Sequence, residues 1–281
     1  MQKYLVIGDP IGHSRSPGMQ NAAFRACGLG EPYGIRRITP EELPEFFEFA
    51  RKNLCGVNLT VPHKIHAAEL ADELTPRAAQ CGSVNTLIIK DNVILGDSTD
   101  GVGLERALTY NFKTSLAGKK ILFCGAGGAA RATAVHLAQC GTTEVSFINR
   151  TLSKAEELAA LCQKIVPELI CRCTTPDNEN SARELLANAD FLIQATSLGL
   201  KPEDPPPLPL EWFSANMKLK IFDTIYHQTP LQKYAGTMNI ACAGGKEMLI
   251  QQGAESFTCW TGIPAPLDAM RDGFDHGSPG K

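Results

Sequence analysis

A glycine-rich turn between two regular stretches constrains the fold of this chain more than any other feature. Residues 119–124 are apolar enough for a buried strand, and residues 129–139 have the composition of a helix. The spacing G-x-G-x-x-A between them puts Gly125 at a tight turn, Gly127 beside a ligand and Ala130 where helix packs on strand. The pattern therefore predicts a dinucleotide whose pyrophosphate binds at the helix N-terminus.

The rest of the second half of the chain alternates strands and helices in the same way. We expect further strands over 144–149, 190–195, 220–225 and 239–243, and a helix over 153–162. Such alternation is typical of a doubly wound parallel sheet, so the sequence predicts an α/β fold with a Rossmann-type domain. The stretch 116–119 is the expected domain junction.

The residues after the second strand of this domain indicate which dinucleotide binds. A unit that binds NAD normally carries Asp or Glu there, to accept from the ribose 2′-hydroxyl. This chain has Asn149 and Arg150, with Lys154 one turn later. A carboxylate would repel a 2′-phosphate, whereas a guanidinium binds it in bidentate fashion, so the sequence predicts NADP.

The first hundred residues also read as an α/β domain. We expect strands over 4–7, 33–38 and 55–61, helices over 19–27, 40–53, 63–74 and 102–110, and a hairpin of strands 83–89 and 93–97. Thr39 is the expected N-cap of the second helix. After the parallel sheet we expect a helix over 246–261 and a loose tail over 268–281.

Polar residues in this domain allow both structural and functional interpretations. Ser14 and Ser16 precede a helix, so either serine would serve as an N-cap, and the pair would also bind a carboxylate. Lys64 opposes the dipole at a helix start, which points to a function, although on spacing alone an ordinary solvated lysine is the better interpretation. Asp100 stands where a helix begins, a position common for capping residues.

Composition excludes several classes of function. A formal net charge of −3 does not indicate a nucleic-acid partner, and no apolar run is long enough for a membrane span or signal peptide. The 10 cysteines are scattered without a C-x-x-C pair, so we expect reduced thiols and a cytoplasmic location. His63 and His66 lack ligand partners in sequence, so we expect a helix surface there and no metal.

Taken together, the motifs resemble the shikimate dehydrogenase family. They are IGHSRSP (11–17), GVNLTVPHK (56–64), SVNTL (83–87), GDSTDGVG (96–103), CGAGGAAR (124–131), NRTLSKAEELA (149–159), ATSLG (195–199) and G-x-x-M-L-x-x-Q (245–252). They run in the family's order. The resemblance implies a discontinuous substrate-binding domain, 1–100 with 245–281, and an NADP-binding domain, 101–244, with the active site in the cleft between them.

The resemblance also implies roles for individual residues. Lys64 and Asp100 would be the catalytic pair for the reversible reduction of 3-dehydroshikimate to shikimate in chorismate and aromatic amino-acid biosynthesis. Which of the two carries the proton is not settled by sequence. The substrate-binding residues would be Ser14, Ser16, Asn58, Thr60, Asn85, Asp100, Tyr226 and Gln252. The NADP site would include Gly125, Ala126, Gly127, Gly128, Ala129, Ala130, Asn149, Arg150, Thr151, Lys154, Thr196, Ser197, Gly245 and Met248. We expect a monomer or homodimer.

Three other functions compete with this one. The first is a quinate/shikimate dehydrogenase that prefers NAD, which Arg150 and Lys154 disfavour. The second is a non-catalytic dinucleotide-binding sensor, which would be free to lose Lys64 and Asp100. The third is a folate-pathway dehydrogenase, which the paired serines and Gln252 disfavour. The chain departs from the family pattern at Ser98, at Gln194 and in a shortened segment after Tyr226.

Overall fold

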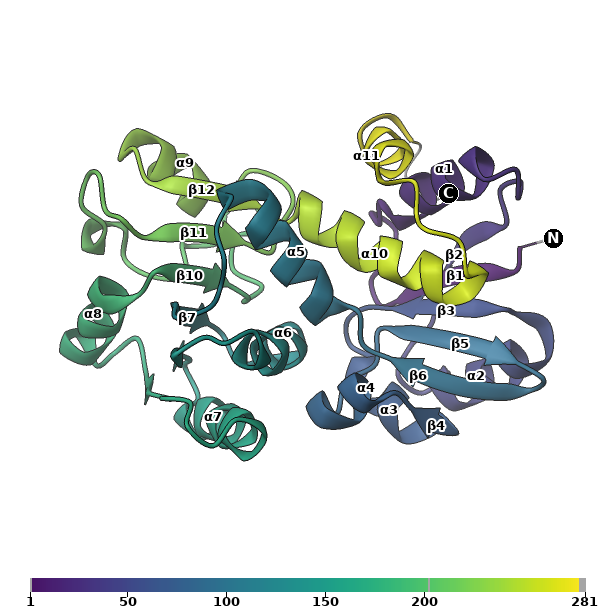
Figure 1. Cartoon of the computed structure of the whole chain (residues 1–281), viewed down its shortest axis with the longest axis horizontal. Helices are drawn as coiled ribbons and strands as arrows, with labels where there is room; N and C mark the ends of the chain where they lie inside the picture. The colour runs from purple at the N-terminus through teal and green to yellow at the C-terminus, as the bar shows by residue number, and fades with distance from the viewer. Residues whose placement is uncertain (1, 202, 278–281) are drawn as a thin grey trace. The chain divides into compact units, whose positions relative to one another are not determined.

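The computed structural model describes residues 2–201 and 203–277 and divides into two compact units. Unit 1 contains the described residues up to Gly103 and those from Leu249 onward, and unit 2 is Leu104–Met248. Both divisions fall inside helices, namely α5 (Asp100–Phe112) and α10 (Lys246–Thr261) (Figure 1). The α/β class is confirmed, and we describe each unit separately.

Unit 1 is built on a mixed six-stranded sheet with the order β2-β1-β3-β5-β6-β4. β1 pairs in parallel with β2 and β3, whereas β5 pairs antiparallel with β3 and β6. Its elements are β1 (Tyr4–Gly8), α1 (Ser16–Ala26), β2 (Tyr33–Arg37), α2 (Leu43–Asn53), β3 (Gly56–Leu59), α3 (Lys64–Leu70), β4 (Glu73–Leu74), α4 (Pro76–Cys81), β5 (Thr86–Lys90), β6 (Val93–Asp97) and α11 (Leu267–His276), with part of α5 and most of α10.

Alternation along the strands gives this sheet two apolar faces. Leu5 and Ile7 join a buried cluster that includes residues of α2 and α3. Val6, between them, joins a second cluster that includes residues of α1, α10 and α11. Residues encoded after position 249 therefore supply much of one face of a sheet whose strands all lie before residue 98.

Unit 2 is a six-stranded sheet with the order β12-β11-β10-β7-β8-β9, and every pair in it is parallel. Its elements are β7 (Lys120–Cys124), α6 (Gly128–Gln139), β8 (Glu144–Ile148), α7 (Leu152–Ile165), β9 (Cys173–Thr174), α8 (Glu179–Asn188), β10 (Phe191–Gln194), the 3₁₀ turn η1 (Leu210–Trp212), β11 (Lys220–Asp223), α9 (Pro230–Thr237) and β12 (Ala241–Gly244). The doubly wound prediction is confirmed.

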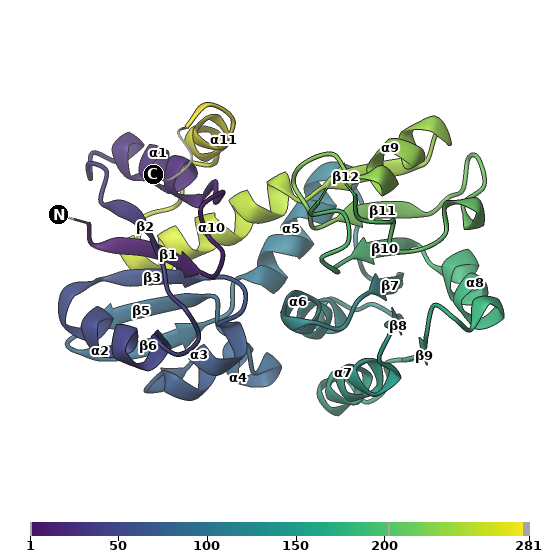
Figure 2. The same ribbon diagram turned by 180° about the vertical axis from the view of Figure 1, so that it is seen from behind.

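The faces of this sheet are covered by different helices. Leu122, Leu192 and Ile221, from adjacent strands, share a buried cluster with residues of α8 and α9. α6 and α7 pack together and contact β8 (Figure 2). Helix α8 and the short elements β4, α4, β9 and η1 were not predicted from the sequence.

The expectation of a loose tail over 268–281 is wrong for its described part. α11 lies against α1 (Figures 1 and 2), with Met270 and Phe274 buried. Small residues permit this contact, because a Cβ added at Gly273 would lie 2.5 Å from both the carbonyl oxygen of Gly18 and the Cβ of Ala22. Residues 278–281 lie outside the described chain.

One helix start, one helix end and the environment of one histidine also differ from expectation. Glu42, not Thr39, is the N-cap residue of α2, and Thr39 N–H donates to the Glu42 carboxylate at 2.8 Å. The expected helix over 63–74 ends at Leu70 and gives way to β4. His63 is buried rather than on a helix surface, and its Nε2 lies 2.8 Å from the carbonyl oxygen of Ile38.

Candidate active site and nucleotide-binding turn

Lys64 and Asp100 form a buried ion pair in unit 1. Lys64 is the first residue of α3 and Asp100 the first of α5, so two helix starts bring the side chains together. Lys64 Nζ donates to Asp100 Oδ2 at 2.6 Å, and the two side chains are only 15% and 6% exposed. Low exposure strengthens the attraction between them and holds both in a defined position.

Asn85 fixes the other carboxylate oxygen of this pair. Its Nδ2 donates to Asp100 Oδ1 at 2.9 Å and to Gln252 Oε1 at 3.1 Å, while Thr99 N–H donates to its Oδ1 at 2.8 Å. Asn85, Asp100 and Gln252 are all buried. Three predicted site residues from well-separated parts of the sequence therefore form one hydrogen-bonded group with Lys64.

Asn58 belongs to a neighbouring buried network that sequence analysis did not foresee. Its Nδ2 donates to Ser256 Oγ at 3.0 Å and to Thr86 Oγ1 at 3.2 Å, and Tyr33 Oη donates to its Oδ1 at 2.8 Å. Burial raises the pKa of Tyr33 well above its ordinary value, so this hydroxyl remains a neutral donor. Strand pairing places Thr86 opposite Asn58.

The predicted serines lie at the start of α1. The helix begins at Ser16, its N-cap residue is Arg15, and no side chain caps it, so the N-cap interpretation of the serines is wrong. Ser14 Oγ instead accepts from Ser16 N–H at 3.2 Å, in a turn. Thr60, directly after β3, is half-buried beside β1, where a Cβ on Gly8 would lie 2.5 Å from its methyl group.

In unit 2 the glycine turn has the backbone that its sequence predicts. Gly125 has φ +102°, and a Cβ there would lie 3.0 Å from the carbonyl oxygen of Ala195, so glycine is required. α6 then starts at Gly128, and its N-cap residue Gly127 offers no side-chain cap. The first-turn N–H groups of α6, with small residues such as Ala129 and Ala130 behind them, suit an anion.

Asn149 links this turn to the end of β8. Its Oδ1 accepts from Ala126 N–H at 3.2 Å, and its Nδ2 donates to the carbonyl oxygen of Thr151, the N-cap residue of α7, at 2.7 Å. Arg150 and Lys154 follow, both exposed, and within residues 2–201 and 203–277 neither is paired with a carboxylate. Two available cations at a helix N-terminus fit a phosphate monoester on the ribose.

Gln194 is one of the departures from the family pattern, and two hydrogen bonds accommodate its side chain. This residue is fully buried; its Oε1 accepts from Thr196 N–H at 2.9 Å and its Nε2 donates to the carbonyl oxygen of Leu198 at 2.7 Å. The amide therefore holds the turn that carries Thr196 and Ser197.

The remaining predicted residues of unit 2 lie near the end of β11 and the start of α10. A Cβ on Gly245 would lie 2.0 Å from the carbonyl oxygen of Thr224, so only glycine fits there. Met248 is buried in α10, and Tyr226, after β11, is 40% exposed.

A second ion pair, partly buried, lies in unit 1, beyond the predicted site. Arg77 Nε donates to Asp97 Oδ1 at 2.7 Å, and its Nη1 donates to Glu255 of α10 at 3.0 Å. Burial opposes ionisation of Asp97, but hydrogen bonds from Arg77 and Thr75 outweigh it and lower the pKa of the carboxyl group. This cluster fastens α10 to β6.

Comparisons with known proteins cover nearly the whole chain. Models of the shikimate dehydrogenase substrate binding domain, of shikimate/quinate 5-dehydrogenase and of the shikimate 5′-dehydrogenase C-terminal domain match residues 6–87, 107–200 and 245–272. A shikimate dehydrogenase (NADP⁺) of Bacillus cereus is 36% identical over 273 residues, covering 96% of each chain.

Solved structures agree with this assignment. A shikimate 5-dehydrogenase from Listeria monocytogenes in complex with shikimate and NAD has a TM-score of 0.87 at 31% identity, covering 96% of each chain. A shikimate 5-dehydrogenase from Thermus thermophilus in complex with NADP(H) and shikimate has a TM-score of 0.85 at 31% identity, covering 99% of this chain and 100% of that one. This chain belongs to the shikimate dehydrogenase family.

Proposed function

We propose that this protein is an NADP-dependent shikimate dehydrogenase, which reversibly reduces 3-dehydroshikimate to shikimate in aromatic amino-acid biosynthesis. The observation that carries this assignment is the buried Lys64–Asp100 pair, held by Asn85 and Gln252 in unit 1. The family relatives named above support the substrate and the cofactor.

Lys64 is the proton donor in the reducing direction and the proton acceptor in the oxidising direction. In the described chain its ammonium group donates a hydrogen bond to Asp100 alone, so its other N–H groups are available to the reacting oxygen of the substrate. Asp100 already binds Lys64 and Asn85 through its two oxygens, which suits a residue that orients the lysine. A positioned acid–base group of this kind contributes about 100- to 10,000-fold to a rate.

The other polar residues of unit 1 would bind the substrate. Ser14 and Ser16 offer hydroxyl donors to its carboxylate, while Asn58, Thr60, Asn85 and Gln252 offer hydrogen bonds to its hydroxyls. We also assign Tyr226 of unit 2 to substrate binding. In this assignment the substrate-binding domain is 1–100 with 245–281, and the NADP-binding domain is 101–244.

The residues of unit 2 have the chemistry that NADP requires. The turn from Gly125 to Ala130 would bind the pyrophosphate through backbone N–H groups, and Arg150 and Lys154, beside Asn149 and Thr151, would bind the 2′-phosphate. Thr196, Ser197, Gly245 and Met248 would line the rest of the site. When bound, the cofactor supplies or accepts the hydride, and the protein provides orientation.

Two properties complete the proposed function. The protein acts in the cytoplasm as a monomer or homodimer, and ten free thiols support a reducing compartment. Among the described residues, no helix combines the length and apolar character needed to cross a bilayer.

Initial rates test the assignment directly. Shikimate and quinate are each compared with NADP and with NAD, at matched enzyme concentration. We expect the highest kcat/KM with shikimate and NADP. Comparable rates with quinate and NAD would show that the enzyme is instead a quinate/shikimate dehydrogenase, and absence of all four activities would favour the sensor.

A further inference from the structure

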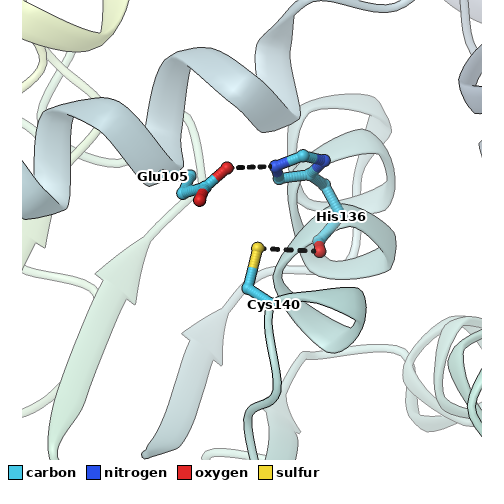
Figure 3. Close-up of side chains that lie close together, drawn as sticks. All are labelled: Glu105, His136 and Cys140. Carbon is cyan, nitrogen blue, oxygen red and sulfur yellow. Dashed lines mark hydrogen bonds and ion pairs between the residues drawn. The ribbon is translucent and has the colours of Figure 1, made fainter. Parts of the chain in front are cut away.

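Three potential metal ligands meet in unit 2, away from the nucleotide-binding turn. Glu105 lies on α5, His136 in the last turn of α6, and Cys140 at the C-cap of the same helix. Their ligand atoms all lie within 4.8 Å of one another. Figure 3 shows the Glu105 carboxylate and the Cys140 sulfur both turned toward the His136 ring. His136 and Cys140 are one helical turn apart, so they share a face of α6.

We propose that Glu105, His136 and Cys140 form a binding site for a zinc-like divalent cation. A carboxylate oxygen, an imidazole nitrogen and a thiolate sulfur are the ligands that Zn²⁺ takes in proteins, whereas Mg²⁺ and Ca²⁺ require oxygen ligands. Three protein ligands leave one tetrahedral position for water. The side chains of His136 and Glu105 are 23% and 40% exposed, so an ion can reach the site from solvent.

The distances require only small movements on binding. His136 Nε2 lies 2.7 Å from Glu105 Oε2, where the two groups share a hydrogen bond. Tetrahedral bonds of about 2.0–2.3 Å place neighbouring ligand atoms about 3.3–3.8 Å apart, so an ion would separate these two atoms by about 1 Å. The sulfur of Cys140 donates to the carbonyl oxygen of His136 at 3.3 Å, a contact that suits a protonated thiol.

Binding therefore exchanges protons for the ion. The Cys140 thiol loses its proton to the buffer as the sulfur–metal bond forms. His136 Nε2 loses the proton of its hydrogen bond to Glu105, which goes to Nδ1 of a neutral ring or to the buffer from an imidazolium, so that nitrogen and carboxylate each bind the metal. The metal keeps its oxidation state, so no oxidant or reductant is involved. The ion joins α5 to α6 and will stabilise the folded protein by an amount that grows with the logarithm of its concentration above the Kd.

Cobalt titration of the chelator-treated, full-length protein tests this site. Co²⁺ reports tetrahedral thiolate ligation through a near-ultraviolet sulfur-to-cobalt charge-transfer band and visible ligand-field bands. We expect one equivalent of Co²⁺ to bind, one equivalent of Zn²⁺ to displace it, and proton release to appear as a buffer dependence of the binding enthalpy.

Variants locate the site. Cys140→Ser should abolish the charge-transfer band, and Glu105→Gln and His136→Ala should each weaken Co²⁺ binding at least about 10-fold. Two matched controls should bind as the wild type does: Cys55→Ser, at an exposed thiol, and His276→Ala, in an exposed His–Asp pair.

Turnover measured with chelator present checks that each variant is folded, because none of these five residues belongs to the proposed active site. No charge-transfer band in the wild type, an unchanged band in Cys140→Ser, or an equal loss in the controls would overturn the proposed site.

Discussion

Replacement of Lys64 by alanine separates the chemical role of this lysine from its structural role. Without the ammonium group the substrate oxygen has no acid–base partner, so we expect kcat to fall about 100- to 10,000-fold. This corresponds to about 3–5 kcal/mol of activation free energy. The KM for NADP should stay within about threefold, because the residues assigned to NADP lie in unit 2.

The structural cost follows from the burial of Asp100. Removing one partner of a fully buried ion pair costs about 3–5 kcal/mol, because the other charge remains unpaired. Lys64 keeps 15% exposure and Asp100 keeps the hydrogen bond from Asn85, so we expect about 2–3 kcal/mol. Adding Asp100→Asn should recover about 1–2 kcal/mol, since a neutral amide tolerates burial without a cation.

The assay pairs two measurements on the same four proteins: wild type, Lys64→Ala, Asp100→Asn and the double variant. Turnover is followed as NADPH formation from saturating shikimate, and stability by thermal unfolding in a double-mutant cycle. Lys52→Ala, at an exposed lysine of α2, is the control and should retain full activity and stability. Turnover of Lys64→Ala within tenfold of the wild type would refute its acid–base role. If Asp100→Asn destabilises the wild type and Lys64→Ala equally, the energetic coupling between Lys64 and Asp100 is refuted.

Three further predictions rest on individual contacts. Arg150→Ala should raise the KM for NADP about 10-fold, as expected for the loss of a charge-assisted hydrogen bond, and leave the KM for NAD unchanged in steady-state assays. The pKa of Asp97 is lower in the folded protein than in the unfolded chain, where it is near 4. At a pH above the unfolded pKa, the ionised Asp97 therefore stabilises the folded protein, and this stabilisation is lost as the pH falls through the folded pKa. Arg77→Met should therefore lower the Tm at neutral pH and flatten its decline between pH 5 and 3; an unchanged decline would contradict this. Gly245→Ala, which drives a Cβ against a backbone carbonyl, should cost about 2 kcal/mol or more in chemical unfolding, whereas Gly236→Ala, with open space around it, should not.

The glycine turn and most strands of unit 2 could be predicted because short, continuous stretches of sequence specify them. The glycine turn needs the positive φ of Gly125, and Asn149 reaches Ala126 from the end of the adjacent strand. Both features follow from a strand–turn–helix repeat. The buried partners of Asn58 could not be read in this way, since Ser256 is 198 residues away and reaches Asn58 only after α10 covers the sheet.

The prediction of a loose tail was wrong for a different reason. The Gly-Ser-Pro-Gly ending of 268–281 suggested a loose segment, but Leu267, Met270 and Phe274 recur at helical spacing. The pattern was available in the sequence, whereas the close approach to Gly18 was not. In the same way, Glu105 and His136 are 31 residues apart, and no spacing rule brings them together with Cys140.

The division of the chain has a consequence for its synthesis on the ribosome. Unit 2 is continuous, so every residue of its parallel sheet and both apolar faces are available once Met248 has emerged. Unit 1 starts earlier but must wait, because Ile250, Phe257 and Phe274 are part of the cluster that covers one face of its sheet. Unit 1 is therefore the first to begin synthesis and the last to be completed. Until its C-terminal residues emerge, the uncovered apolar face of its sheet is accessible to chaperones, proteases and other nascent chains.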